Sequence, residues 1–397
     1  MPSSRTILIA GAGIGGLTAA LALAARGLRA IVFEQAEKPA ESGAGIQLGP
    51  NATRILTGLG LGETLRSRSV VPEAISVRAA RNGQEIVRVP LGAEAEFRYG
   101  APYWLIHRSD LHSALLEAAR DHPDIVVKLG TRVEDFAPHS HGLTAQVIQS
   151  RARNEERGIG LIAADGLWST LRTRLGHGKP PRFQQRTAWR AIIPASELGE
   201  SFRAPIVHLW LGRDGHVVHY PVRGGNDINV VAIVNDRWQS EEWDSAGASD
   251  QILRRFKADN WHAAVRGMLA KASVWKRWAL YDRPPDWRWG TGPITLLGDA
   301  AHPMVPFLAQ GAGMAIEDAS VIAQCLENSG IDTAAAMRRY EGLRRARTRR
   351  AQRAALSTGQ IYHQDGPAAF VRDAAMKVMG GERLRARYDW LYDWRSD

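Results

Sequence analysis

A glycine-rich turn near the N-terminus has the residues and spacing needed to hold a pyrophosphate. The sequence GAGIGG, residues 11–16, joins a short apolar strand pattern to a helical one and spells G-x-G-x-x-G. We expect Gly11, Gly13, Gly15 and Gly16 to keep this turn tight and open to phosphate at the helix N-terminus. Glu34 follows Gly16 by the distance at which a carboxylate meets an adenosine ribose. These residues predict a dinucleotide site but do not separate FAD from NAD.

Two later segments repeat the pattern of an apolar strand followed by a turn and a helix. LIAADGLWSTLR, residues 161–172, has a strand pattern ending at Asp165, and Ser169 is the expected cap of the next helix. ITLLGDAAHPMVPFLAQGAGMAIEDA, residues 294–319, has a strand pattern ending at Asp299 and a second glycine turn at Gly311 and Ala312. The three motifs in this order suggest one site built from distant parts of the chain.

A third candidate feature is a pair of polar side chains on an apolar strand face. Residues 206–234 read as a three-stranded meander with turns at GRDG and RGGND. His216 and Tyr220 would be the only polar residues on one face, about 13 Å apart at a rise of roughly 3.3 Å per residue. They form either a satisfied core pair or a substrate site, because burial without partners is costly. His208 and His219 would lie on the opposite face as structural residues.

The elements that position these residues indicate an α/β protein. The first strand, helix and second strand form a βαβ unit and therefore a parallel, Rossmann-like sheet. We expect this nucleotide-binding domain to be interrupted by a β-rich substrate domain and closed by C-terminal helices. The predicted boundaries are residues 1–70, 99–180 and 281–330 for the nucleotide-binding domain, 71–98 and 181–280 for the substrate domain, and 331–397 for the helical segment.

Composition limits the possible classes of function. The chain has 397 residues, 45% hydrophobic and 23% charged, which is typical of a globular protein. Cys325 is the single cysteine, which excludes an internal disulfide and a multi-cysteine zinc site. We therefore expect a cytoplasmic protein with no metal centre.

The net charge of +10 permits binding to nucleic acid or anionic membranes but does not require it. The densest basic run, residues 338–353, has helical spacing and no interleaved aromatic platform, so we expect a solvent-facing helix and no nucleic-acid partner. The uncharged run at residues 6–25 is divided by four glycines, which argues against a membrane span. The aromatic tail RYDWLYDW is expected to dock on the body of the protein or on a second subunit, so a homodimer is possible.

The three motifs together resemble the FAD-dependent aromatic hydroxylases, single-component flavoprotein monooxygenases with the para-hydroxybenzoate hydroxylase fold. The chain is most similar to the branch acting on salicylate, 3-hydroxybenzoate and 6-hydroxynicotinate. SGAGIQLGPNATRIL, APYWLIHRSDLHSALL, LWLGRDGHVVHYPVRGG and YDWLYDW also match, so the resemblance covers nearly the whole chain.

The resemblance implies specific roles around FAD. Asp299 would bind the ribityl chain, and the amides near Gly311 and Ala312 would face the isoalloxazine ring and stabilise negative charge on reduced flavin. Arg108 and Gln47 correspond to flavin-side residues, although the 6-hydroxynicotinate enzymes are expected to have a histidine in place of the glutamine. The remaining implied residues are Asp165, linked to FAD and the nicotinamide cofactor, and Pro306, which would line the substrate pocket.

The resemblance also implies a reaction. NAD(P)H would reduce FAD, O2 would form a flavin C4a-hydroperoxide, and a phenolic acid would be hydroxylated. His216, assisted by Tyr220, would deprotonate the substrate hydroxyl. Arg190 would meet a substrate carboxylate or take part in a structural ion pair. Two alternatives are a flavin-dependent reductase or epoxidase acting on a non-aromatic ligand, and a non-catalytic FAD-binding interaction protein.

Overall fold

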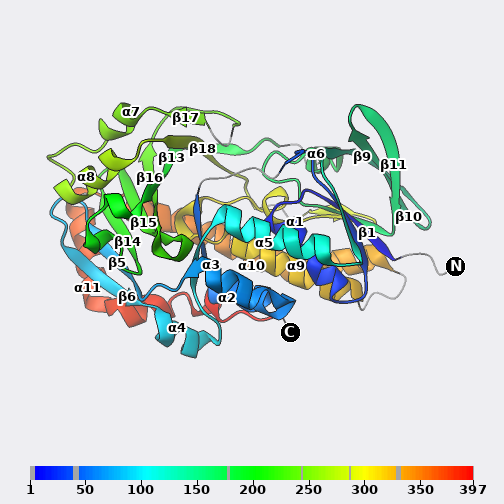
Figure 1. The fold of residues 1–397 in the computed structure, drawn as a ribbon, viewed down its shortest axis with the longest axis horizontal. Helices are drawn as coiled ribbons and strands as arrows, with labels where there is room; N and C mark the ends of the chain where they lie inside the picture. The colour runs from blue at the N-terminus through cyan, green and yellow to red at the C-terminus, as the bar shows by residue number, and fades with distance from the viewer. Residues whose placement is uncertain are drawn as a thin grey trace.

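The computed structural model describes residues 5–38, 44–176, 179–242, 245–285, 288–327 and 332–396. Its two large sheets lie toward opposite ends of the long axis, and helices α5, α9 and α10 run between them (Figure 1). The predicted α/β class is therefore correct. The expected domain boundary at residues 330 and 331 lies outside the described residues.

The first sheet is built around the βαβ unit. Strand β1 has its five residues buried, which explains the uninterrupted apolar sequence of a central parallel strand. The edge strand β19 is antiparallel to β20, and the other strand pairs are parallel. In spatial order the strands are β19 (Gly290–Thr291), β20 (Ile294–Leu296), β12 (Gly160–Ala163), β1 (Thr6–Ala10), β2 (Arg29–Phe33) and β8 (Ile125–Lys128).

Four helices accompany this sheet. They are α1 (Ile14–Ala24), α5 (Arg108–Asp121), α9 (Gly311–Glu327) and α10 (Thr333–Tyr362). Helix α1 is rich in alanine and almost fully buried, so α5 and α9 pack directly against it. A separate antiparallel sheet of β9 (Thr131–His139), β10 (Gly142–Gln149) and β11 (Ala152–Gly158) lies at the end of the molecule farthest from the second large sheet (Figure 1).

The second large sheet has eight strands. One face packs on α7 (Ser249–Leu253) and α8 (Ala263–Lys271) through a tryptophan-rich core, and helix α11 (Gly366–Ala386) lies beside β6 (Figure 1). Strands β5 and β14 are parallel, and the other neighbouring pairs are antiparallel. The order is β17 (Ser245–Gly247), β18 (Trp275–Asp282), β13 (Arg182–Pro194), β16 (Asp227–Asn235), β15 (Gly215–Val222), β14 (Ile206–Gly212), β5 (Ala74–Ala79) and β6 (Glu85–Pro90).

The predicted meander is present as β14, β15 and β16, but its third strand has a different register. His216 pairs with Ile233, and Tyr220 pairs with Asn229. The turn between β15 and β16 contains one residue fewer than we expected, and a shift of one residue exchanges the two faces of a strand. Val231 and Ile233 therefore share the His216 face. The alternate residues of this strand pack in the core on the other side of the sheet, namely Ile228, Val230, Ala232 and Val234.

Smaller elements connect the two sheets. They comprise the sheet of β3 (Gly45–Leu48), β7 (Trp104–His107) and β4 (Ser69–Val70), helices α2 (Pro50–Leu56), α3 (Gly62–Arg68), α4 (Gly92–Tyr99), α6 (Thr170–Arg174) and α12 (Asp389–Tyr392), a π-helical turn (Thr57–Leu61), and 3-10 turns at Ala195–Glu197, Glu200–Phe202, Arg223–Gly225, Gly298–Ala300 and Pro306–Leu308. Helix α4 begins inside residues 71–98, which we assigned to the β-rich substrate domain.

The serines at the starts of α6 and α5 have different roles. Ser169 caps α6, because its Oγ accepts a hydrogen bond from the Arg172 amide at 2.9 Å. Ser109 does not cap α5, which already begins at Arg108. The Ser109 hydroxyl is instead 2.6 Å from the Nδ1 atom of His107.

The basic run at residues 338–353 belongs to α10 and is not simply solvent-facing. Arg344 is 1% exposed and forms ion pairs with Glu317 and Asp318. Arg347 donates hydrogen bonds to the carbonyls of Trp390 and Leu391 at 2.7 and 2.9 Å. The solvated-face prediction is therefore wrong for these arginines, because they anchor the aromatic tail on the body of the same chain.

Candidate active site

Two of the N-terminal glycines are required by the backbone itself. Gly11 has φ +103°, and a Cβ there would lie 2.4 Å from the carbonyl oxygen of Ala164. A Cβ on Gly16 would lie 2.0 Å from the carbonyl oxygen of Gly11. Gly13 differs, because nothing in the protein lies within 4 Å of its ideal Cβ. This open position lines the cavity, as expected for a backbone that a phosphate approaches.

Glu34 supports the glycine turn directly. Its Oε2 accepts a hydrogen bond from the Ala12 amide at 2.9 Å, and its Oε1 accepts one from the Ala36 amide at 3.0 Å. His112 approaches the same turn, with Nε2 2.7 Å from the carbonyl oxygen of Ala12. The carboxylate is thus fixed at the end of β2, where the sequence predicted a ribose partner.

The distal motif supplies the opposite part of the cavity wall. Asp299 and Arg108 both line the cavity. Burial raises the pKa of Asp299, and the neighbouring His302 and Arg108 side chains lower it in part. Helix α9 begins at Gly311 beside Asp299, and Ala312 also lines the cavity. The first amides of this 17-residue helix provide the positive end of its dipole.

A buried network that the motif analysis missed holds the distal loop in place. The Asp318 carboxylate lies 2.5 Å from Nε2 of His302 and accepts a hydrogen bond from the Gly298 amide at 3.1 Å. Arg344 donates to the other oxygen of Asp318 at 2.7 Å. Burial raises the pKa of Asp318, but His302 and Arg344 outweigh this effect and lower the pKa to about 2. The sequence signal was the pair Glu317 and Asp318 inside an otherwise apolar helical pattern.

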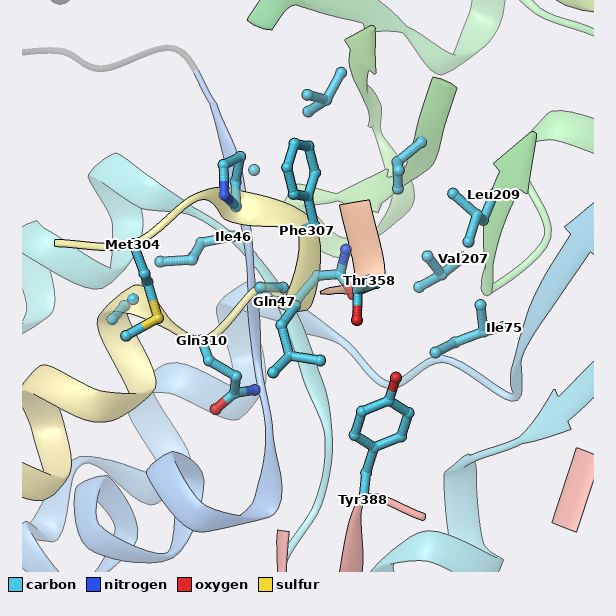
Figure 2. A pocket seen from close by; sticks show the side chains of 18 of the residues that line it. Ile46, Gln47, Ile75, Val207, Leu209, Met304, Phe307, Gln310, Thr358 and Tyr388 are labelled. Carbon is cyan, nitrogen blue, oxygen red and sulfur yellow. The ribbon is translucent and has the colours of Figure 1, made fainter. Parts of the chain in front are cut away.

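The cavity between these loops and the eight-stranded sheet has a volume of about 500 Å³. Figure 2 shows Ile75, Val207 and Leu209 on one side and Met304 and Gln310, which belong to the distal motif, on the other. Strands β5, β6, β13, β14, β15 and β16 contribute mainly apolar side chains. Among the lining residues of these strands, the polar ones are Arg190, His216 and Tyr220. The cavity is thus an apolar chamber with a few polar groups, which is typical of a ligand site.

His216 lies deep in this chamber. It is 2% exposed, and its ring meets the rings of Phe307 and Tyr362 edge-on at centroid distances of 5.5 and 5.4 Å. Its Nδ1 is 2.7 Å from Nε2 of His363. Burial, together with His363 and Arg186, holds the pKa of His216 well below its usual value, so the ring is neutral near pH 7.

Tyr220 belongs to a polar cluster that the predicted register concealed. Tyr103 donates a hydrogen bond to Oε1 of Gln47 at 2.9 Å, and Gln47 also hydrogen-bonds to Tyr220. Asn229, opposite Tyr220 on β16, accepts a hydrogen bond from the Gly45 amide at 2.6 Å. Burial raises the pKa of Tyr220, so its hydroxyl keeps its proton. The correct register of β16 would have placed Asn229 in this cluster.

Arg190 is the charged residue that the sheet presents to the cavity. It pairs with Val231 across β16, on the His216 face, and its guanidinium carbon is 3.3 Å from the centre of the Trp278 ring. Such stacking orients a guanidinium. His208 and His219 lie on the other face with their rings stacked at 4.6 Å, and Trp210 donates a hydrogen bond to His219 at 3.1 Å.

Asp165 has a different environment from the other predicted cofactor residues. Its two carboxylate oxygens accept hydrogen bonds from the Ser169 hydroxyl at 2.6 Å and from the Leu171 amide at 3.2 Å. The side chain therefore shapes the start of α6. Its neighbours Ala164 and Gly166, not Asp165 itself, line the cavity.

Pro306 lines the cavity at the start of the 3-10 turn that carries Phe307. The tail contributes Tyr388 and Tyr392 to the wall, and Figure 2 shows the Tyr388 hydroxyl directed inward toward Thr358. Sequence reasoning recognised that the tail would dock but did not assign it to the site. The aromatic residues at positions 388 and 392, spaced by one helical turn, were the available signal.

The arrangement fits FAD. The open space over Gly13, the helix N-termini at α1 and α9, and the carboxylates of Glu34 and Asp299 provide donors and acceptors for pyrophosphate, flavin and sugar hydroxyls. Within the described ranges, no group of three His, Cys, Asp or Glu side chains is placed to hold a metal ion. No helix of the described part of the chain is long and apolar enough to cross a membrane.

Comparisons with known proteins agree with this geometry. A family model described as an FAD binding domain matches residues 4–355. A 3-hydroxybenzoate 6-hydroxylase of Klebsiella oxytoca is 38% identical over 391 residues, covering 98% of this chain and 97% of that protein. A 3-amino-4-hydroxybenzoate 2-monooxygenase of Streptomyces platensis is 39% identical over 392 residues, covering 98% of this chain and 96% of that protein.

Solved structures show the same fold along the whole chain. A salicylate hydroxylase substrate complex has a TM-score of 0.83 at 27% identity and covers 100% of this chain and 97% of that one. HpxO of Klebsiella pneumoniae, complexed with FAD and uric acid, has a TM-score of 0.85 at 26% identity and covers 98% of this chain and 96% of that one. FAD is the cofactor, and NAD(P)H is the usual reductant of such enzymes. The chain belongs to the family of FAD-dependent aromatic-ring monooxygenases.

Proposed function

We propose that this monooxygenase hydroxylates the ring of a small phenolic carboxylic acid, such as a hydroxybenzoate, with NAD(P)H and O2 as co-substrates. The observation that carries the proposal is the apolar sheet face bearing Arg190, His216 and Tyr220 opposite the FAD loops. A cation, a neutral base and a phenol on one apolar wall match a ring with a carboxylate and a hydroxyl. The curated relatives that act on hydroxybenzoates support this substrate class.

The residues that would hold FAD fall into two groups. Gly11, Gly13, Gly15, Gly16 and Glu34 would hold the pyrophosphate and adenosine end. Asp299, Arg108, Gln47 and the amides of Gly311 and Ala312 would hold the ribityl chain and ring, whereas Asp165 would act indirectly by shaping the neighbouring turn. Bound FAD, once reduced, supplies the activated oxygen.

The protein's own contribution is to orient and activate the substrate. Arg190 would bind the carboxylate, because a stacked guanidinium presents a fixed fork of donors. His216 would accept the proton of the substrate hydroxyl, which makes the ring more electron-rich where oxygen is transferred. Tyr220, whose hydroxyl stays protonated, would donate a hydrogen bond within the same chamber, and Pro306 would close its wall.

A panel of phenolic acids tests this proposal. FAD-loaded protein is mixed with each acid and with NADH or NADPH, and both nicotinamide oxidation and product mass are measured. Hydroxylation of at least one phenolic acid, with consumption of O2, is the expected result. Oxidation that yields only peroxide would favour the reductase alternative, and FAD binding without turnover would favour a non-catalytic role.

We also propose that the chain forms a homodimer in the cytoplasm. Helix α11 exposes Phe370, Val371 and Val378 by 76%, 65% and 85%, which is a candidate apolar contact between two copies. The single cysteine, Cys325, suits a reducing compartment. Light scattering after size-exclusion chromatography tests the dimer, and Val378→Lys should shift the protein toward monomer.

A further inference from the structure

His363 contacts the proposed base, yet none of the sequence motifs includes it. It follows Tyr362, the last residue of α10, and its Nε2 is 2.7 Å from Nδ1 of His216. The two ring centroids are 5.0 Å apart with an interplanar angle of 41°. A residue 147 positions away in the chain therefore shares a hydrogen bond with the base.

The direction of this hydrogen bond decides what His216 can do. A neutral imidazole carries one N–H donor and one acceptor nitrogen. If His363 donates from Nε2, then His216 carries its own proton on Nε2 and cannot accept one from a substrate. If His216 donates from Nδ1, its Nε2 is a lone-pair acceptor. Only the second arrangement makes His216 a base, so His363 must accept through Nε2 and carry its proton on Nδ1.

The charges around the pair disfavour an imidazolium at either ring. Arg186 of β13 lowers the pKa of both histidines, and Arg372 of α11 also acts on His363. Burial is the largest cause in each case, and it brings the pKa of His363 to about 3. The other neighbours of the His216 ring are the neutral phenol of Tyr362 and the ring of Phe307. An imidazolium at His216 therefore depends on an acceptor for its Nδ1–H, and Nε2 of His363 lies in position to provide that acceptor.

The end of α10 is built to hold His363 in place. The Arg372 guanidinium donates hydrogen bonds to the carbonyls of Ile361, Tyr362 and Gln364 at 3.2, 3.1 and 3.3 Å. His363 is only half-buried, and the chain reaches the surface at Asp365. The Nδ1 atom of His363 is buried and has no hydrogen-bond partner within the described part of the chain, so the ring's contact with His216 is made through Nε2.

We propose that His363 is a positioning residue that keeps His216 in the base-competent tautomer by accepting the hydrogen bond from its Nδ1. The substrate O–H bond breaks as its proton binds Nε2 of His216. His216 becomes an imidazolium beside the substrate phenolate, and its Nδ1–H stays hydrogen-bonded to Nε2 of His363. The substrate proton thus ends on Nε2 of His216, the substrate becomes a phenolate, and His363 stays neutral. This inference rests on the proposed function.

Two substitutions at His363 test whether its hydrogen-bond acceptor matters: one keeps an acceptor and the other removes it. His363→Gln offers an amide oxygen that can accept the hydrogen bond from Nδ1 of His216. His363→Phe keeps the ring volume and removes the acceptor. His208→Phe is the matched control, because His208 is a buried histidine on the opposite face of the sheet. FAD-loaded enzymes are assayed with 3-hydroxybenzoate for product formed per nicotinamide oxidised, for kcat and for KM.

We expect His363→Phe to lower product formation at least about tenfold with little change in KM, within the range that general-base catalysis contributes. His363→Gln, which keeps the acceptor, should stay within about threefold of wild type, and His208→Phe should match wild type. The ¹⁵N NMR signals of His216 in the oxidised holoenzyme provide the second readout, with Nδ1 protonated in wild type and in His363→Gln. A resting His216 protonated on Nε2, or a His363→Phe enzyme with unchanged coupling and kcat, would overturn the proposal.

The same measurements distinguish failure of this inference from failure of the proposed function. If wild type forms no hydroxylated product with any phenolic acid, the proposed function fails, and protonation of His216 on Nε2 would then also reject the positioning role. If wild type is active and the His363 variants equal it, only the role of His363 is rejected.

Discussion

The Asp318 carboxylate lies 2.5 Å from Nε2 of His302, and both side chains are buried beneath the loop that carries Asp299. The same carboxylate accepts a hydrogen bond from the Gly298 amide and forms an ion pair with Arg344 of α10. A helix residue that does not line the cavity therefore fixes a loop that does.

Asp318→Asn should destabilise the protein by roughly 3 kcal/mol, because it removes one charge from a buried ion pair. Urea unfolding of the holoenzyme gives the free energy of unfolding. The control is Asp250→Asn, which alters an exposed pair with Arg254 and should change stability by less than about 0.5 kcal/mol. Equal unfolding midpoints for Asp318→Asn and wild type would disprove the role of this network.

The two glycines of the N-terminal turn should respond differently to alanine. Gly16→Ala forces a Cβ against the Gly11 carbonyl and should lower the melting temperature even without FAD. Gly13→Ala meets no protein atom within 4 Å, so the apoprotein should melt as wild type does. FAD affinity should nevertheless fall at least about tenfold, which is about 1.4 kcal/mol. Flavin fluorescence titration measures it, and wild-type affinity in Gly13→Ala would contradict a pyrophosphate at this position.

Arg190→Gln should weaken the binding of a hydroxybenzoate about 10- to 100-fold, since hydrogen bonds to charged groups contribute about 1.5–3 kcal/mol. The affinity for a phenol without a carboxylate should change little. Arg277→Gln is the matched control, because Arg277 also stacks on tryptophans but on the opposite face of the sheet. Binding is followed by the perturbation of the flavin spectrum. An equal loss for charged and uncharged ligands would remove Arg190 from carboxylate recognition.

His208 gives the stability a predictable pH dependence. Burial, with Arg78 and Arg88, lowers its pKa from 6.5 to about 4. Between these values the unfolded chain binds a proton that the folded chain does not, so the free energy of unfolding falls as the pH falls. The slope from this residue reaches about 1.4 kcal/mol per pH unit. Urea unfolding across this window should show a shallower slope for His208→Phe, and parallel slopes would refute the assignment.

The sequence predicted the fold class and the three cofactor motifs because these depend on local patterns. The apolar strands before Gly11, Asp165 and Asp299 are short and continuous. Each is followed by a turn that contains a glycine or a carboxylate, and this pattern can be read from neighbouring residues alone. Because β1, β12 and β20 are parallel neighbours, the motifs that follow them lie together at the carboxyl ends of the strands.

The remaining site residues depend on longer-range geometry. The register of β16 rests on one residue in the turn at Arg223–Gly225, which adopts positive φ at Gly224, and local pattern did not reveal this. The contacts of His363 with His216 and of Tyr392 with Tyr103 join segments far apart in the chain. Such pairs follow from tertiary packing and leave no periodic signal.

The most direct test of the central claim is isotopic. FAD-loaded enzyme is given 3-hydroxybenzoate, NADH or NADPH, and ¹⁸O2, and the product is analysed by mass spectrometry. We predict a dihydroxybenzoate that carries one ¹⁸O atom and forms in proportion to the nicotinamide oxidised. Nicotinamide oxidation that yields labelled peroxide and leaves the phenolic acid unlabelled and unchanged would contradict ring hydroxylation of this substrate.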